Sequence, residues 1–207
     1  MSKFDYTKEE VKLFRKLNSP QKIQDYLNSL KFNFGKDAKL FSPRVVIKTK
    51  KADCLEGAVL AAAILEFHGQ KPLILDLRST TKPFDYDHVV AVFRRYNCFG
   101  AISKTNHGVL RYREPVYKTV RELVLSYFHE YFLENGKKTL REYSKPFDLN
   151  TVKNINWRTG EENLWRIHEI LDELKHYSIL SKKQINNLRK ADDTEIEAGK
   201  IVQYRNS

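Results

Sequence analysis

The sequence has few cysteines and none of the common metal motifs. Its two cysteines, Cys54 and Cys98, lie in different contexts, and neither a CxxC nor an HExxH motif occurs. These features predict no disulfide framework, no metal site and no cofactor. No run approaches the roughly 18 consecutive apolar residues that cross a bilayer, and residues 1–5 lack the apolar stretch of a signal peptide. We therefore expect a cytoplasmic protein without a membrane partner.

Negative charge is also scarce, since 26 acidic residues face 37 basic ones and leave a net charge of +11. Such an excess can assist binding to nucleic acid, an anionic surface or an acidic substrate. The basic residues are spread along the chain rather than forming one block, so nucleic-acid binding is the weaker hypothesis. The oligomeric state does not follow from the sequence.

The length and the apolar content predict one folded domain. Of the 207 residues, 41% are apolar and 12% aromatic, which is enough to bury a substantial core. We assign residues 1–190 to a single domain with helical additions at both ends. Residues 191–207 are charged and have no clear period, so we expect a loosely ordered tail there.

The segments before residue 54 predict two helices and an undecided element. Thr7 with Glu10 forms a capping box before an apolar pattern, and Ser19 followed by Pro20 starts a second helix. Residues 31–41 are predicted to be a loop. Residues 42–47 combine a Ser-Pro cap with a β-branched run, and the pattern does not decide between a short helix and a strand.

The central segment predicts an α+β domain. Residues 54–67 are apolar nearly all round, which is typical of a buried helix. Short apolar runs at 73–78, 88–94 and 99–103 predict three strands of one antiparallel sheet on which this helix packs. Further helices are predicted at 119–132, at 162–180 and from Ser181 to Lys190.

Cys54 is the candidate nucleophile, because it lies at the predicted start of the central helix. Unpaired N–H groups and the positive end of the helix dipole favour a thiolate there. Gly57, in the same turn, leaves room for a substrate to approach the backbone. The alternative is that Cys54 is an inert buried residue, as free cysteines commonly are.

His88 is the candidate base for the Cys54 thiol. A nucleophilic cysteine needs an imidazole that meets it in space, and His88 opens a strand after a polar loop. The five other histidines are weaker candidates because of their positions: His68 at a helix end, His107 in a turn, His129 and His168 on amphipathic helices, and His176, which we interpret as a solvent-side helix residue.

Residues 51–106 resemble the transglutaminase-like superfamily. The resemblance lies in Asp53-Cys54-Leu55-Glu56-Gly57-Ala58, then Gly69-Gln70-Lys71-Pro72, then Asp87-His88-Val89-Val90-Ala91-Val92, and last the segment 99–106. Beyond this stretch, most of the chain is similar to bacterial transglutaminase-like proteins of unassigned activity. The resemblance implies a papain-related core, with a central helix on a small antiparallel sheet and flanking helices.

The resemblance also implies a third residue that orients His88. Phe99 stands where the superfamily has tryptophan, and Ser103 stands where it has the orienting aspartate. A serine can fix the tautomer of the imidazole but hardly stabilises its cation. Asn106 is favoured by chemistry and Ser103 by position, and Asp76 on the preceding strand is a third possibility.

These observations leave two main hypotheses for the function. The first is a cysteine protease, amidase or acyltransferase that forms a thioester on Cys54 by attacking an amide or ester carbonyl and passes the acyl group to water or an amine. The second is a catalytically degenerate member of the same fold that binds a peptide or a protein. Arg111, Arg113 and nearby tyrosines either line a cleft for such a ligand or serve packing.

Overall fold

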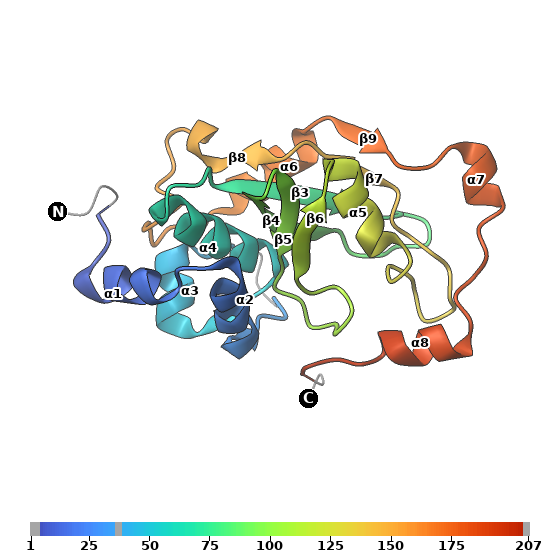
Figure 1. Cartoon of the computed structure of the whole chain (residues 1–207), viewed down its shortest axis with the longest axis horizontal. Coiled ribbons are helices and arrows are strands. Elements are labelled where there is room, and N and C mark those ends of the chain that lie inside the picture. Colours follow the sequence, from blue (N-terminus) through green and yellow to red (C-terminus); the bar gives the residue numbers. More distant parts are fainter. Residues whose placement is uncertain (1–4, 36–38, 205–207) are drawn as a thin grey trace.

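The computed structural model describes residues 5–35 and 39–204 and has the predicted α+β architecture. The helices are α1 (Lys8–Lys16), α2 (Pro20–Ser29), α3 (Pro43–Thr49), α4 (Cys54–Phe67), α5 (Val120–Phe128), α6 (Trp165–Glu173), α7 (Lys182–Asn186), α8 (Asp193–Gly199) and the 3-10 turn η1 (Leu149–Thr151). The strands are β1 (Lys31–Phe32), β2 (Lys51–Ala52), β3 (Leu73–Arg78), β4 (His88–Arg95), β5 (Cys98–Ile102), β6 (Arg113–Tyr117), β7 (Glu142–Ser144), β8 (Phe147–Asp148) and β9 (His176–Ser178). Figure 1 shows their arrangement.

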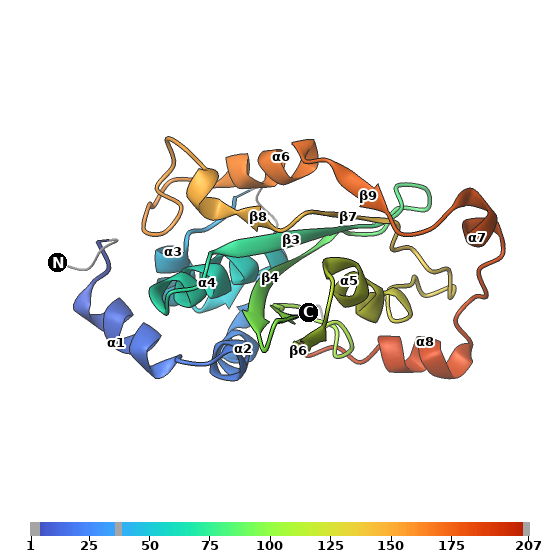
Figure 2. The same cartoon turned by 45° about the horizontal axis from the view of Figure 1, so that its top comes forward.

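One antiparallel sheet organises the molecule. Its strand order is β6-β5-β4-β3-β7-β9, and β8 also pairs with β3. The three predicted strands are therefore neighbours in one sheet, as expected. Helix α4 packs on one face of this sheet and α5 on the other (Figure 2). In the described ranges, no helix combines the length and the apolar content needed to span a membrane.

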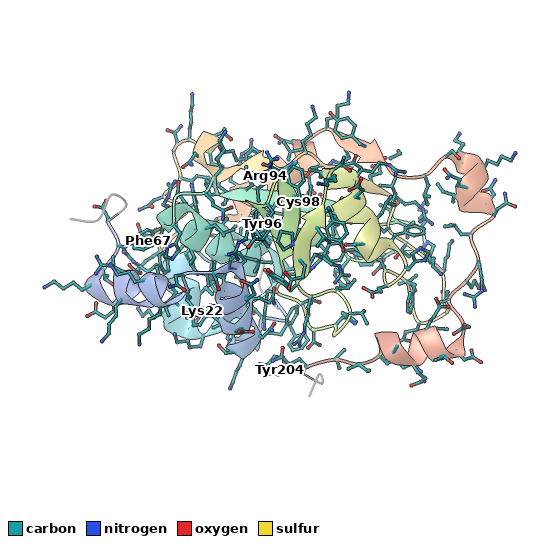
Figure 3. The ribbon with its side chains drawn as sticks, in the orientation of Figure 1. Lys22, Phe67, Arg94, Tyr96, Cys98 and Tyr204 are labelled. Carbon is teal, nitrogen blue, oxygen red and sulfur yellow. The ribbon has the colours of Figure 1, made fainter. Side chains whose placement is uncertain are left out.

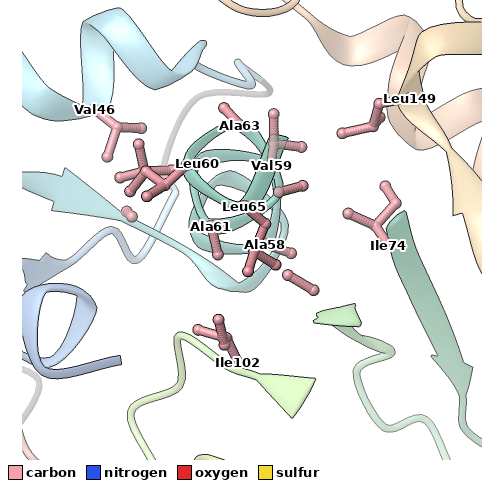
Figure 4. Close-up of a cluster of buried hydrophobic side chains, with 14 of the residues drawn as sticks. Val46, Ala58, Val59, Leu60, Ala61, Ala63, Leu65, Ile74, Ile102 and Leu149 are labelled. Carbon is pink, nitrogen blue, oxygen red and sulfur yellow. The ribbon is translucent and has the colours of Figure 1, made fainter. Parts of the chain in front are cut away.

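Helix α4 is the centre of the larger core. Its residues from Leu55 to Leu65 are all buried, which explains why this segment is apolar on every side. Side chains from α3, β3 and β5 surround it, among them Val46, Ile74 and Ile102 (Figure 4). This packing fixes the position of the first turn of α4, where the candidate nucleophile lies.

Side-chain alternation along the strands decides which residues meet α4. The α4 face of the sheet carries Ile74, Val89, Ala91, Phe93 and Ile102. The α5 face carries Leu75, Leu77, Val90, Val92 and Ala101. Successive residues of a strand point to opposite faces, so a shift of one residue exchanges the two sets.

Several predicted elements have different bounds in the structure. The undecided segment at 42–47 belongs to helix α3, because Ser42 caps it and Pro43 occupies the first turn. The predicted loop at 31–41 contains the two-residue strand β1, and its residues 36–38 lie outside the described ranges. The helix predicted at 119–132 ends at Phe128.

The last third of the chain departs further from the prediction. The predicted helix at 162–180 is only Trp165–Glu173, and His176–Ser178 is a strand that pairs with β7. The expected tail contains helix α8, which Asp192 and Glu195 cap reciprocally, and residues 201–204 form hydrogen bonds to the body of the protein. Residues 205–207 of the predicted tail lie outside the described ranges.

Candidate functional site

Cys54 is the first residue of α4, as predicted. The preceding Asp53 caps the helix, because its carboxylate accepts the N–H of Glu56 at 2.8 Å. The Glu56 carboxylate accepts the N–H of Asp53 in return, at 2.9 Å. This capping box fixes where the helix begins, and it places a carboxylate directly beside the thiol. Cys54 is a free cysteine and keeps partial solvent exposure.

The surroundings of Cys54 favour the protonated thiol. Burial raises the pKa of Cys54 to about 12, and the neighbouring Asp53 carboxylate adds to this shift. The backbone N–H groups of Val89 and Leu55 lower the pKa, but by less than burial and Asp53 raise it. Burial and the Asp53 carboxylate therefore oppose the effect of the helix start and favour the protonated form of this thiol.

His88 lies on the α5 face of the sheet. It is paired with Leu77 in the register of β3 and β4, and Leu77 belongs to the core cluster on the α5 face. The imidazole ring lies edge-on to the ring of Tyr127 in α5, with centroids 6.5 Å apart. Burial lowers the pKa of His88 to about 3, with smaller contributions from His107 and Arg113. His88 is therefore a buried, neutral histidine.

Cys54 and His88 lie near each other in the fold, but their side chains do not form the expected hydrogen bond. The sulfur of Cys54 lies at the backbone N–H of Val89, the residue after His88. The His88 ring points to the other face, and within the described residues no hydrogen bond joins it to the Cys54 sulfur. Strand alternation is the reason, because it is Val89 that faces α4.

Ser103 does contact His88, as its position in the sequence predicted. The Nε2 atom of His88 lies 2.7 Å from Ser103 Oγ, and that hydroxyl donates to the carbonyl of Leu110 at 2.9 Å. Because the single hydroxyl proton is used by Leu110, we assign the imidazole proton to Nε2, which donates to Ser103. Ser103 thus fixes the tautomer of His88 without carrying a charge.

Gln24 of α2 holds the backbone of Ser103 in place. Its side-chain amide accepts the N–H of Ser103 at 2.9 Å and donates to the Ser103 carbonyl at 2.8 Å. Gln24 is buried and 79 positions away in the sequence. Little in the sequence marks Gln24 as a functional residue, apart from its place beside Ile23 on the apolar face of a predicted helix.

Asn106 has a different role from the one predicted. Its side-chain amide donates to the carbonyl of Tyr204 at 2.9 Å, and its Oδ1 accepts the Tyr204 N–H at 2.8 Å. Within the described residues, Asn106 makes no hydrogen bond to His88. The chain after β5 does turn, but it turns toward residues 201–204.

Asp76 orients a second histidine, not His88. It lies on the α4 face, where its Oδ2 accepts from His176 Nε2 at 2.8 Å, and both side chains are at most 4% exposed. The Nδ1 atom of His176 is 2.8 Å from the Leu174 carbonyl. Both ring nitrogens face acceptors, which indicates an imidazolium. The alternation of Lys175-His176-Tyr177-Ser178-Ile179 was the sequence signal for this strand, and we interpreted it as part of a helix.

Arg113 and Gly57, both noted in the sequence, serve packing. The Arg113 guanidinium lies over the Tyr127 ring, 4.1 Å from its centroid, and pairs with Glu130 at 2.6 Å. The space beside Gly57 is filled, because a Cβ atom there would lie 2.3 Å from the Cβ of Lys104. This space therefore holds a lysine of the same chain.

The loop between β3 and β4 presents exposed aromatic side chains on a rigid frame. Ser79 holds it by donating from its backbone to Asp87 at 2.7 Å and from its hydroxyl to the Asp85 carbonyl at 2.6 Å. The Tyr131 hydroxyl donates to the carbonyl of Tyr86. Nevertheless Phe84 is 63% and Tyr86 76% exposed, with ring centroids 4.9 Å apart. Two large rings are thus held in contact with solvent.

Comparisons with known proteins do not assign the chain to a family. No family model matches the chain, and a search of curated proteins finds no match. Among the described residues, no group of three or more histidine, cysteine or acidic side chains is placed to hold a metal ion. The resemblance to the transglutaminase-like superfamily and the catalytic roles of the four candidate residues remain predictions.

Proposed function

We propose that this protein binds a peptide or protein ligand and does not use Cys54 as a nucleophile. The orientation of His88 carries this proposal, because its ring contacts Ser103 and Tyr127 and, among the described residues, no hydrogen bond joins it to the Cys54 sulfur. The raised pKa of Cys54 and the lowered pKa of His88 favour the neutral thiol and the neutral imidazole. In this proposal the chain is a catalytically degenerate protein on a transglutaminase-like scaffold.

The loop at residues 79–87 supports a binding role. Exposed aromatic residues are frequent at the centres of protein interfaces, where they bury a large area. A loop that is already held by hydrogen bonds loses little conformational freedom on binding. Phe84 and Tyr86 fit this description, since the backbone beside both is hydrogen-bonded and their rings are free of the core. We propose them as the main ligand contacts.

The first experiment measures the reactivity of Cys54. The alkylation rate with iodoacetamide is followed from pH 6 to pH 10 in a Cys98→Ser background and compared with a cysteine-containing model peptide. We expect Cys54 to react about a hundredfold more slowly than the peptide at pH 8, since few thiolates form and higher intrinsic nucleophilicity only partly compensates. His88→Ala should leave this rate unchanged. Fast alkylation at pH 7 that depends on His88 would instead support the thiol enzyme.

The second experiment looks for the ligand. A random peptide library is selected on the parent protein and counter-selected on the Phe84→Ala/Tyr86→Ala variant. Selected peptides should bind the parent at least tenfold more tightly than that variant. Tyr96→Ala is the matched control, because Tyr96 is 75% exposed but lies in the turn between β4 and β5. If selection yields no binder, or if binders ignore both rings, the proposed ligand surface is wrong.

A further inference from the structure

The segment after β5 is paired with residues 201–204 as with an added strand. The Gly108 N–H donates to the Ile201 carbonyl at 2.9 Å, and the Gln203 N–H donates to the Asn106 carbonyl at 2.9 Å. Between these two bonds, His107 and Val202 form an antiparallel bridge. In Figure 3, Tyr204 of the 201–204 segment lies below α2. Residues 201–204 therefore lie along residues 104–108 as a short added strand.

Asn106 recognises the backbone of the occupant. Its side-chain amide meets both the N–H and the carbonyl of Tyr204, at 2.8 and 2.9 Å. These two bonds, together with the backbone bonds of Gly108 and Gln203, depend on an extended peptide and not on its side chains. Extended peptides are commonly bound in this way, with main-chain bonds for affinity and side-chain sites for selectivity.

Two side chains of the 201–204 segment also have polar partners on the neighbouring chain. The Gln203 amide donates to the Asn28 carbonyl at 2.7 Å and accepts from Arg111 at 3.0 Å. The Tyr204 hydroxyl donates to the Leu30 carbonyl at 3.1 Å. The Tyr204 ring lies 5.6 Å from the ammonium of Lys104, within the range of a cation–π contact. An amide side chain followed by an aromatic one with a hydroxyl satisfies both positions.

The ammonium of Lys104 lies beside the site of the Tyr204 ring. The residue is 1% exposed and its Nζ donates to the Leu30 carbonyl at 2.6 Å. Burial lowers the pKa of Lys104 to about 8, and the nearby Arg111 contributes. An aromatic face at this position stabilises a buried ammonium that has lost most of its water.

The occupant is held mainly by polar contacts. Ile201 is 65% exposed, and neither Val202 nor Tyr204 belongs to the buried core. Few buried apolar contacts mean that such a segment opens more readily than the core strands do. Residues 201–204 belong to neither of the two buried cores, so their departure would break no core contact.

We infer that the edge formed by residues 104–108 is a peptide-binding site occupied in cis by residues 201–204, and that its external ligand is an extended peptide with a Gln-Tyr pair. This site is separate from the loop at 79–87 and goes beyond the proposed function. A tethered occupant competes with an effective concentration in the millimolar range. External peptides therefore bind the parent weakly until the 201–204 segment leaves.

The test uses the full chain and a fluorescein-labelled, amidated peptide with the sequence of residues 199–204. Binding is followed by fluorescence polarisation. The Gln203→Ala/Tyr204→Ala variant loses the side-chain contacts of the occupant and should bind the peptide at least tenfold more tightly than the parent. Adding Asn106→Ala should reverse this gain. The control is Asn18→Ala, because Asn18 is an exposed asparagine at the other end of α2.

A second measurement needs no variant. In the parent, amide hydrogen exchange at residues 201–204 should accelerate when the unlabelled peptide is added in excess. The inference is overturned if the Gln203→Ala/Tyr204→Ala variant binds no better than the parent, if Asn106→Ala has no effect on the gain, or if exchange at 201–204 is unchanged. The alkylation of Cys54 reports on the proposed function separately, so the two can fail independently.

Discussion

The replacement Asp76→Asn tests the buried ion pair on the α4 face. Asp76 and His176 are 2.8 Å apart, with side chains 4% and 2% exposed, so the pair is almost completely shielded from water. Removal of the carboxylate leaves the imidazole without its counter-charge. Breaking a buried pair by removing one partner typically costs about 3–5 kcal/mol. We expect a loss of this size in the free energy of unfolding at pH 6.

The cost of Asp76→Asn should depend on pH. Burial lowers the pKa of His176, but the hydrogen bonds to Asp76 and Leu174 outweigh burial, and the net shift is upward. A raised pKa means that the folded state binds the proton more tightly than the unfolded chain does. This contribution is complete below the unfolded pKa of about 6.5 and is lost as the pH rises through the folded value. The difference between parent and variant should therefore shrink at pH 9.

Urea denaturation followed by circular dichroism at pH 6 and pH 9 measures both effects. The matched control is Asp172→Asn, because Asp172 pairs with His168 at 3.3 Å while both side chains remain about half exposed. An exposed pair of this kind contributes about 0–1 kcal/mol. The reasoning is refuted if Asp76→Asn costs no more than Asp172→Asn at pH 6, or if its cost grows as the pH rises.

Two further replacements test the packing around Ser103 and α4, with urea denaturation as the assay. Gln24→Ala should cost about 2–4 kcal/mol, because it leaves the N–H and the carbonyl of Ser103 buried and without partners; a cost under 1 kcal/mol would mean that water replaces the amide. Gly57→Ala should cost about 1–3 kcal/mol, although alanine favours helices, because its Cβ meets that of Lys104. In a Lys104→Gly background the same change should be neutral or stabilising, and a persistent loss would contradict the steric explanation.

Local sequence signals were sufficient for the centre of the fold. The run at 54–67 is apolar on every side, which only a buried helix satisfies, and three short apolar runs follow it with links of hairpin length. The capping residues Thr7 and Ser19 also occupy the predicted helix starts, whereas Ser42 caps a helix that the sequence left undecided. These signals act within a few residues, so they can be recognised without knowledge of the tertiary structure.

Local signals could not predict which face of the sheet carries the His88 side chain. A strand presents alternate residues to alternate faces, and a sequence in which both faces are buried does not say which set meets the helix. In β4, all residues from His88 to Phe93 are buried. The hydrophobic pattern therefore does not tell which of these residues face α4 and which face α5. The structure places Val89 on the α4 face and the His88 ring on the α5 face beside Tyr127.

The partners of the candidate residues were also hidden by distance along the chain. Gln24 meets Ser103 over 79 positions, Asp76 meets His176 over 100, and Asn106 meets Tyr204 over 98. No local pattern encodes such contacts. The helix predicted at 162–180 was too long, because its helical pattern ends at Leu174 and residues 176–178 pair with β7 as a strand.

The contacts of the segment after β5 have a consequence for the order of folding. Ser103 is held by Gln24 from early in the chain, and Asn106 is bound by Tyr204 from late in it. Contacts between such distant positions close large loops and tend to form slowly. During synthesis, the sheet around β3 to β5 can assemble while residues 201–204 have not yet been made. Residues 104–108 are thus made well before the segment that pairs with them in the folded protein.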